Sequence, residues 1–278
     1  MTYIMTLNTH SWMEEEANEK LIQLADRIIE MDYEVVALQE VNQLLDSKQA
    51  TTDQFFQAVA KQRPIHVDNF AYVLTELLKE RGRSYYWSWT ASHIGYDRYA
   101  EGVAILSKQP IQASDCRVSV EDDFSDYHTR RLLIGKTKVF GQTVRIVSSH
   151  YSWWQADQEA GFSYEWDRTI DYLKQESGPI MLMGDLNNAA DVREEGYDYV
   201  HQTAPELQDA YQLASEKQGR YTVEKSIDGW EGNHQQLRID YIFLTADFSV
   251  ETYRVIFDGK TGPVVSDHYG VEVRLVHR

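Results

Sequence analysis

The sequence contains only one cysteine, Cys116, in 278 residues. A single thiol cannot form an intrachain disulfide, so a disulfide-stabilised scaffold is excluded and a reducing, cytoplasmic environment is expected. Proline is also scarce, with five residues, and neither a repeat nor a Pro/Ser-rich tract interrupts the chain. Because no linker between domains is apparent, we expect one domain over residues 1–278.

Long apolar runs are missing as well. No segment approaches the roughly 20 apolar residues that cross a bilayer as a helix. The first segment, "MTYIMTLNTHSWMEEE", lacks the basic start of a signal peptide and soon becomes acidic. We therefore expect no membrane insertion. The 42% hydrophobic and 26% charged content is typical of a globular protein with a large core.

Basic residues are fewer than acidic residues. The chain has 27 Lys and Arg against 44 Asp and Glu, a formal net charge of −17. A protein that contacts many phosphates of duplex DNA normally presents a basic face, so the charge disfavours a long polyanion as ligand. It does not exclude a small phosphorylated substrate, particularly if a divalent cation supplies local positive charge.

Short strand and helix patterns fill the chain instead. Apolar alternation or short apolar runs predict strands at residues 2–7, 34–40, 102–107, 131–140, 143–150, 179–185, 239–244, 252–259 and 262–275. A period of 3.6 predicts helices over residues 17–28, 68–80 and 157–175, with Ser11 and Glu14 as a capping box before the first. Hairpins outnumber strand-helix-strand units, so we expect two mostly antiparallel sheets packed face to face, with helices outside.

Strong ligands or bases follow several of these strands. Asn8, Glu40, His150 and Asp185 each lie at the end of a buried strand or directly after it, and such strand ends can converge on one rim. Each has an ordinary explanation, because Asn and Asp are common turn residues and a lone interior His usually makes a structural hydrogen bond. Asp240 can likewise anchor Arg238. All of them being structural together is much less probable.

The stretch "GPVVSDHYGVEVRL" (262–275) repeats the pattern, because Asp267 and His268 interrupt an apolar strand. Burying a carboxylate and an imidazole costs free energy unless they are paired, so the two residues indicate either a structural hydrogen bond or a site.

This set of residues suits the attack of water on a phosphate ester with the assistance of a metal. Mg²⁺ prefers oxygen ligands, which Glu40, Asn8 and Asp267 offer. Asp185 or a nearby His can accept the proton of the attacking water. Donors to the phosphoryl oxygens are Asn187 and His150, and Asp240 can hold His268 in one tautomer.

Seven short segments together resemble the endonuclease/exonuclease/phosphatase superfamily, which includes deoxyribonuclease I, apurinic endonucleases, inositol-polyphosphate 5-phosphatases and bacterial sphingomyelinases. They occur in the family's order over nearly the whole chain. The segments are "LNTH" with Asn8, "LQEV" with Glu40, "EGVAILSK" with Glu101, "SSHYS" with His150, "GDLNN" with Asp185 and Asn187, "RIDYIF" with Asp240, and "SDHYGV" with Asp267 and His268.

The resemblance implies a deoxyribonuclease I-like fold, a four-layer α/β/β/α sandwich of two mixed, mostly antiparallel sheets. It also implies a phosphoesterase site that uses Mg²⁺, with Mn²⁺ as a possible substitute. The metal ligands would be Glu40, Asn8 and Asp267. The catalytic residues would be Asp185 as water activator, Asn187, His150, His268 and Asp240, with Glu101 as a carboxylate that orients His150.

Aromatic residues are dense around two of these segments, at residues 85–102 and 150–155. We expect Trp153, Trp154 and Tyr99 to line the pocket and to stack on a ring or a cationic group of the substrate. The alternative is that such aromatics are core, as the alternation of Trp87 and Trp89 suggests. Arg130, with Arg131 beside it, is a candidate for a substrate phosphate, although an exposed pair at a strand start is the common case.

These features predict a Mg²⁺-dependent hydrolase of a small organic phosphate ester, either a phosphodiesterase or a phosphatase. The first alternative is an endonuclease or exonuclease on DNA or RNA, which would need a locally basic groove. The second is a binding module that has lost catalysis, because fold alone does not guarantee function. None of Glu40, Asp185 and His268 is missing, which disfavours the second. The oligomeric state stays open.

Overall fold

The computed structural model describes residues 1–155, 159–227, 229–230 and 232–277. The helices are α1 (Ala17–Met31), α2 (Phe70–Glu80), α3 (Gly161–Leu173), α4 (Gly196–Thr203) and α5 (Ala210–Leu213), with a short 3₁₀ helix at Ser11–Met13. The strands are β1 (Thr2–Asn8), β2 (Val35–Leu44), β3 (Tyr86–Gly95), β4 (Tyr99–Ser107), β5 (Gln112–Arg117), β6 (Arg131–Val139), β7 (Gln142–His150), β8 (Ile180–Asp185), β9 (Gln208–Asp209), β10 (Glu216–Gln218), β11 (Asp240–Leu244), β12 (Phe248–Ile256) and β13 (Gly270–His277).

The strands form two mixed sheets. One has the order β10-β12-β13-β1-β2-β4-β3, and the other has the order β5-β6-β7-β8-β11-β9. Most neighbours are antiparallel, including the predicted β6–β7 hairpin, whereas β1 and β2, β7 and β8, and β10 and β12 are parallel pairs. The two sheets therefore confirm the predicted mixture of mainly antiparallel strands.

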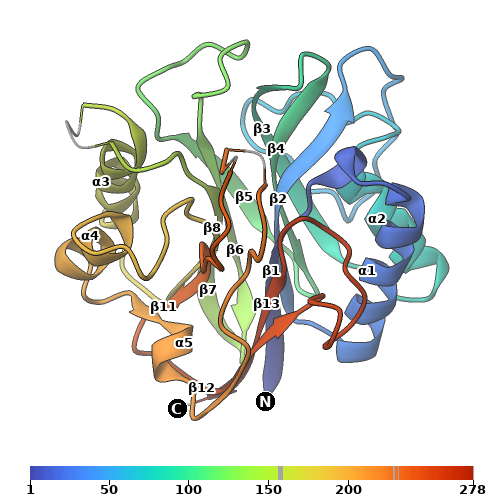
Figure 1. Cartoon of the computed structure of the whole chain (residues 1–278). Helices are drawn as coiled ribbons and strands as arrows, with labels where there is room; N and C mark the ends of the chain where they lie inside the picture. The colour runs from blue at the N-terminus through green and yellow to red at the C-terminus, as the bar shows by residue number, and fades with distance from the viewer. Residues whose placement is uncertain (156–158, 228, 231, 278) are drawn as a thin grey trace.

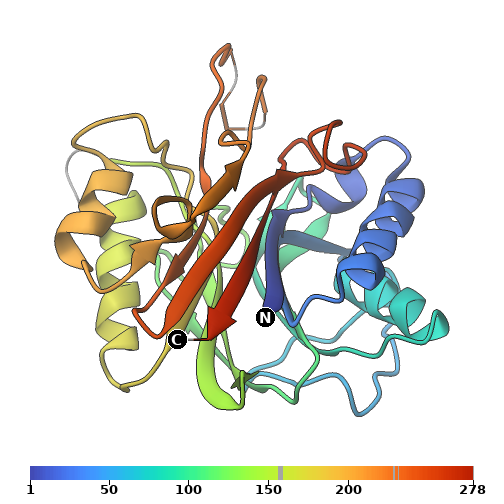
Figure 2. The ribbon, with the colours of Figure 1, turned by 90° about the horizontal axis from the view of Figure 1, so that it is seen from below.

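Helices cover the outer faces of both sheets (Figure 1). α1 and α2 pack on the sheet that contains β1 and β2, and α3 and α4 pack on the sheet that contains β7 and β8. Figure 2 shows the same order of layers from below. A third cluster of apolar side chains fills the space between the sheets. The arrangement confirms the four-layer α/β/β/α sandwich. None of the helices in the described part of the chain is both long enough and apolar enough to span a membrane.

Strand pairing brings the candidate residues to one end of the sandwich. The parallel pair β7–β8 aligns His150 with Asp185, and the antiparallel pair β8–β11 aligns Asp185 with Asp240. In the other sheet, β1–β2 aligns Asn8 with Gln39, next to Glu40. Because the sheets lie face to face, these two rows of strand ends meet across the sandwich.

Two local predictions were wrong. The stretch 262–275 is not one strand, because β13 begins at Gly270 and the preceding residues form a loop. In that loop the Ser266 hydroxyl donates to the backbone oxygen of Asn8 at 2.7 Å, a side-chain bond that replaces ladder pairing. Ser11 caps no α-helix, since it lies in the 3₁₀ helix and its hydroxyl accepts from the backbone N–H of Asn42.

Element boundaries also shift. The N-cap of α1 is Glu16, in a left-handed conformation. Helix α3 begins at Gly161, and residues 157 and 158 of the predicted helix lie outside the described residues. Strand β3 (Tyr86–Gly95), which contains both Trp87 and Trp89, adds an edge strand to the predicted set, and both indoles are buried in the core.

Candidate active site

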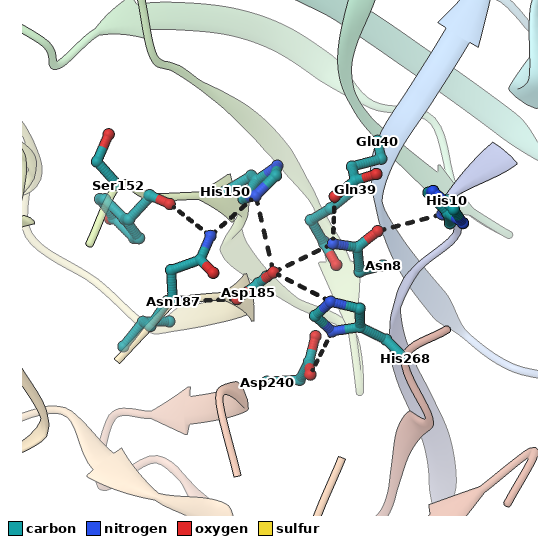
Figure 3. Close-up of polar contacts among 12 residues, drawn as sticks. Asn8, His10, Gln39, Glu40, His150, Ser152, Asp185, Asn187, Asp240 and His268 are labelled. Carbon is teal, nitrogen blue, oxygen red and sulfur yellow. Dashed lines mark hydrogen bonds and ion pairs between the residues drawn. The ribbon is translucent and has the colours of Figure 1, made fainter. Parts of the chain in front are cut away.

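Three buried side chains form the centre of the candidate site: Asp185, Asp240 and His268 (Figure 3). Asp185 ends β8 and Asp240 begins β11, while His268 reaches them from the loop before β13 in the other sheet. The Nδ1 atom of His268 lies 2.9 Å from Asp240 Oδ2, and its Nε2 lies 3.8 Å from Asp185 Oδ2. The carboxylate of Asp240 therefore keeps a proton on Nδ1 and turns Nε2 toward Asp185.

Asn8 joins carboxylates that come from the two sheets. Its Nδ2 donates to Glu40 Oε1 at 2.8 Å and to Asp185 Oδ2 at 3.1 Å. Glu40 lies in a bulge of β2 and has a left-handed backbone, with φ of 51°. A bulge redirects the side chain of an extra residue, and here it turns Glu40 into the site rather than along the ladder.

His150 and Asn187 form the opposite side of the centre. His150 Nε2 lies 3.7 Å from Asp185 Oδ2 and accepts a hydrogen bond from Asn187 Nδ2 at 3.1 Å. The Asn187 amide is fixed further, because its nitrogen donates to the Tyr151 carbonyl and its oxygen accepts from Trp230 Nε1. Asn187 also donates its backbone N–H to Asp185 Oδ1 at 2.7 Å.

Burial makes the carboxyl groups of Asp185 and Glu40 weak acids. Desolvation, and then the charge of Asp240, raise the pKa of Asp185 to about 7, although His268 and the hydrogen bonds from Asn187 and Asn8 oppose the rise. Desolvation and the charges of Glu101 and Asp267 raise the pKa of Glu40 to about 8. Ionising both at neutral pH thus requires additional positive charge in the site.

The two histidines are shifted in opposite directions. Burial alone would lower the pKa of His268, but the charges of Asp240 and Asp185 raise it well above its usual value. Burial, followed by the nearby charge of Arg130, holds the pKa of His150 well below its usual value. At neutral pH His268 is therefore an imidazolium, whereas His150 is a neutral imidazole.

A pocket of about 220 Å³ opens above this centre. It is lined by Glu40, His93, Gly95, Tyr96, Glu101, Tyr127, Arg130, His150, Trp153, Asp185, Asn187, Gly229 and His268. The buried guanidinium of Arg130 is thus at the pocket, where sequence analysis expected it. It is anchored from behind, since Arg130 Nε donates to Ser152 Oγ at 3.3 Å and Ser152 Oγ donates to the buried Glu165 at 2.7 Å.

Glu101 lines the pocket but pairs with a different histidine from the expected one. Its Oε1 lies 3.2 Å from His93 Nε2, and the β3–β4 register places the two residues opposite each other. Burial alone would raise the pKa of Glu101, but the hydrogen bond and charge of His93 lower it. The expected contact with His150 is replaced by this pair because β3 inserts His93 beside Glu101.

The three aromatic residues that were expected to line the pocket lie in different environments. Trp153 lines the pocket and packs so closely on Gly229 that a Cβ there would collide with the indole. The neighbouring Trp154 instead packs on Tyr199 of α4, with ring centroids 5.6 Å apart, beside the cluster under α3. Tyr99 is buried at the start of β4, next to the guanidinium of Arg98, and is not among the described residues that line the pocket.

Asp267 lies at the edge of the site, next to His10. Its Oδ1 is 3.8 Å from His10 Nδ1, which also bonds to Glu14 Oε1 at 2.7 Å. Burial would lower the pKa of His10, but the bond to Glu14 and the charges of Asp267 and Glu40 raise it to about 9. His10 thus provides a positive charge beside the carboxylates of Asp267 and Glu40.

The residues present fit a hard divalent cation. Glu40 and Asp267 offer carboxylate oxygens, the ligand type that Mg²⁺ prefers, whereas the Asn8 amide turns its nitrogen toward Glu40 and Asp185 and its oxygen accepts from the backbone N–H of His10. After burial, the charges of Glu101 and Asp267 raise the pKa of Glu40, and a bound cation would offset this repulsion. A second group, Asp185, Asp240 and His268, has ligand atoms within 4.8 Å of one another, and the buried Oδ1 of Asp240 has no hydrogen-bond partner among the described residues.

Sequence reasoning missed several residues that complete the site. His10 stands in the segment "LNTH" that contains Asn8, so its proximity to Asn8 was a usable signal. The other missed residues come from segments whose orientation depends on strand register and loop path, which no sequence motif indicates. They are His93, Tyr96, Tyr127 and Trp230.

Comparisons with known proteins give one family. The profile of the Endonuclease/Exonuclease/phosphatase family matches residues 12–268. An endonuclease/exonuclease/phosphatase family protein from Leptotrichia buccalis C-1013-b has 33% sequence identity and a TM-score of 0.85, with 99% of this chain and 100% of that chain covered.

More distant structures share the fold alone. A mannosyl-6-phosphatase from Bacteroides thetaiotaomicron VPI-5482 has 16% identity and a TM-score of 0.68, over 99% of this chain and 100% of that chain. Truncated TDP2 from Caenorhabditis elegans has 15% identity and a TM-score of 0.64, over 100% of this chain and 98% of that chain. Comparison with curated proteins found no significant match.

Proposed function

Because the chain belongs to the endonuclease/exonuclease/phosphatase family, a superfamily of phosphoesterases, we propose that it is a Mg²⁺-dependent hydrolase of a small organic phosphate ester. The observation that carries the proposal is the environment of Asp185. Its Oδ2 lies 3.1 Å from Asn8 Nδ2, 3.7 Å from His150 Nε2 and 3.8 Å from His268 Nε2, at the floor of a pocket large enough for a phosphate group.

Asp185 acts as the general base. A pKa of about 7 is close to the optimum for a group that must be ionised at working pH and still accept a proton in the transition state. The proton moves from the attacking water to a carboxylate oxygen of Asp185, while the new P–O bond forms and the bond to the leaving oxygen breaks. The hydrogen bond from the Asn187 backbone to Oδ1 keeps this carboxylate fixed and leaves Oδ2 toward the pocket.

The positive and polar groups around the pocket stabilise the phosphoryl oxygens as negative charge develops. His268 is the imidazolium, held by Asp240, and it adds a charged donor. Arg130 adds a guanidinium, the group best suited to two phosphate oxygens. Because His150 Nε2 accepts from Asn187, the neutral imidazole of His150 carries its proton on Nδ1 and donates from there.

Glu40, Asn8 and Asp267 would hold the cation. A bound Mg²⁺ supplies Lewis-acid stabilisation of phosphoryl oxygens and lowers the pKa of a coordinated water. The chain's own contribution is to bring two carboxylates and an amide together on β1, β2 and the loop before β13. Mn²⁺, which accepts the same oxygen ligands, is expected to substitute.

Three features favour a small substrate over a nucleic acid. The pocket is about 220 Å³, the net charge is −17, and aromatic side chains form its wall. Trp153 and Tyr127 provide ring faces for a sugar or an aromatic leaving group. A structural neighbour described as a mannosyl-6-phosphatase gives a precedent for a phosphorylated sugar on this fold. The cytoplasmic location stays a prediction from the single cysteine.

The test is Glu40→Gln, which removes one carboxylate charge with little change in shape. We expect Mg²⁺ affinity, measured calorimetrically, to fall by at least about tenfold, and turnover of an aryl phosphate to fall with it. Glu15→Gln is the matched control, since Glu15 is exposed and outside the pocket lining. Unchanged Mg²⁺ affinity and turnover in Glu40→Gln would show that the metal site lies elsewhere, and absent turnover in the wild type with every metal would favour a binding module.

A further inference from the structure

A second cavity, of about 210 Å³, lies beside the catalytic pocket and is rich in basic side chains. Lys61, Arg63 and Arg131 line it, together with Phe124. The guanidinium carbon of Arg63 lies 3.4 Å from the centroid of the Phe124 ring, so the ring holds this side chain against the cavity wall. We call this cavity the cationic pocket.

The positive charge of the cationic pocket is not neutralised by the protein. Two carboxylates line it, and each has a cation of its own: Asp115 Oδ2 accepts from Arg131 Nε at 2.7 Å, and Asp122 Oδ1 lies 3.6 Å from Arg117 Nε. Lys61 and Arg63 form no ion pair within the part of the chain that the structure describes. The charges of Lys61 and Arg63 are therefore available to an anion in the pocket.

The basic groups also repel one another. Burial, and then the charge of Arg131, lower the pKa of Arg63. An anion between the two guanidinium groups would relieve this repulsion. Planar guanidinium groups match the geometry of phosphate oxygens, whereas the ammonium of Lys61 adds a point charge.

The cationic pocket is separated from the catalytic pocket by a thin wall. Ser92, Thr129 and Arg131 face the cationic pocket, while their neighbours in sequence, His93 and Arg130, line the catalytic pocket. The wall is held together, because His93 Nδ1 lies 3.1 Å from the Thr129 carbonyl. The same segment continues through Phe124, whose carbonyl accepts from the backbone N–H of Ile94 at 2.7 Å.

We propose that the cationic pocket is a second anion site, distinct from the catalytic centre, that binds the phosphate group of a small molecule through Arg63, Arg131 and Lys61. The site stands on its own residues and does not depend on the catalytic chemistry proposed above. The phosphate can come from two sources: a second phosphate group on the substrate, or a separate phosphorylated molecule that binds behind the wall.

The test is equilibrium binding of inorganic phosphate in chelator at constant ionic strength, followed by calorimetry or phosphorus NMR. We compare the wild type with Lys61→Ala/Arg63→Ala, which removes the two unpaired cations. The control is Lys138→Ala/Lys260→Ala, which removes the same total charge from exposed positions outside the pocket lining. All four positions are exposed, so the variants should fold, which circular dichroism checks.

We expect the wild type and the control to bind one phosphate in chelator, and Lys61→Ala/Arg63→Ala to bind it at least about tenfold more weakly. Equal affinity in all three proteins, or no binding by the wild type up to about 10 mM phosphate, would overturn the proposal. Because chelator removes the catalytic metal, this result does not depend on whether the protein is a phosphoesterase.

Steady-state kinetics then show whether the bound phosphate group belongs to the substrate or to a separate molecule. If the second phosphate belongs to the substrate, Lys61→Ala/Arg63→Ala raises KM for a bisphosphorylated ester but not for the monophosphorylated one. If it belongs to a separate molecule, inorganic phosphate changes the turnover of a monophosphorylated ester by the wild type but not by the variant. Either pattern supports an anion site in the cationic pocket, and the binding comparison decides whether the site exists.

Discussion

The Asp240→Asn substitution tests whether the paired carboxylate of His268 contributes to catalysis. The two groups are 2.9 Å apart, and at an effective dielectric constant of about 20 a full charge pair at this distance interacts by about 6 kcal/mol. The variant keeps part of this electrostatic support, because Asp185 Oδ2 remains 3.8 Å from His268 Nε2. The Asn amide can also donate to Nδ1, which allows the unproductive tautomer. We therefore expect kcat to fall by on the order of 10²–10⁴-fold, or about 3–5 kcal/mol.

Stability should respond differently from activity. The charge of Asp240 contributes to the raised pKa of Asp185, and its Oδ1 has no hydrogen-bond partner among the described residues. Removing that charge relieves repulsion in the metal-free site while it weakens the pair with His268. The two effects oppose each other, so the free energy of unfolding in chelator should change by less than about 2 kcal/mol. The pKa of Asp185 should fall, which moves the acidic limb of the pH–rate profile to lower pH.

The assay is the pH profile of kcat and kcat/KM on an aryl phosphate, with urea unfolding in chelator as the stability measurement. Asp247→Asn, at an exposed position in the turn before β12, is the control for the same chemical change. A kcat within threefold of wild type and an unshifted profile would refute the reasoning, because His268 would then need no carboxylate partner.

Three further predictions concern the groups around this centre. Glu165→Gln removes the charge that anchors Arg130 through Ser152, so kcat/KM should fall by about tenfold; an unchanged kcat/KM would contradict this positioning role. Trp153→Ala should raise KM for an aryl ester more than for a methyl ester, and equal effects on both would argue against stacking. In chelator, the raised pKa values of Asp185 and Glu40, about 7 and about 8, mean that the folded state retains protons that the unfolded chain releases. The free energy of unfolding should therefore decrease by at least about 2 kcal/mol from about pH 5 to about pH 8, and less so in Asp185→Asn; an increase would contradict the pKa directions.

The strands that carry the site could be predicted because their periodicity is local. The alternation in β1 and the apolar run in β8 placed Asn8 and Asp185 at strand ends, where both lie. The two ends come together only through the packing of one sheet on the other. Hydrophobic periodicity predicts the individual strands but not which strand ends meet across the two sheets. The family resemblance predicted that these ends form one site.

Other features depend on the register of distant segments. Glu101 pairs with His93 because a bulge in β3 shifts the β3–β4 register by one residue, and no local pattern reveals such a shift. Trp153 and Trp154 are adjacent in sequence and point to different environments. Which indole faces the pocket is decided by the path of the loop after β7, where Gly229 packs against Trp153 and Tyr199 packs against Trp154.

The central claim is that this pocket hydrolyses a small phosphate ester with the help of a divalent cation. The most direct measurement is hydrolysis of an aryl monophosphate, a bis-aryl phosphate and plasmid DNA, side by side, with Mg²⁺, with Mn²⁺ and with chelator, by the wild type and by Asp185→Asn. We predict metal-dependent turnover of an aryl ester by the wild type, its loss in chelator and in Asp185→Asn, and intact plasmid. Plasmid nicking at low salt that disappears in chelator, or no metal-dependent hydrolysis of either aryl ester, would contradict the claim.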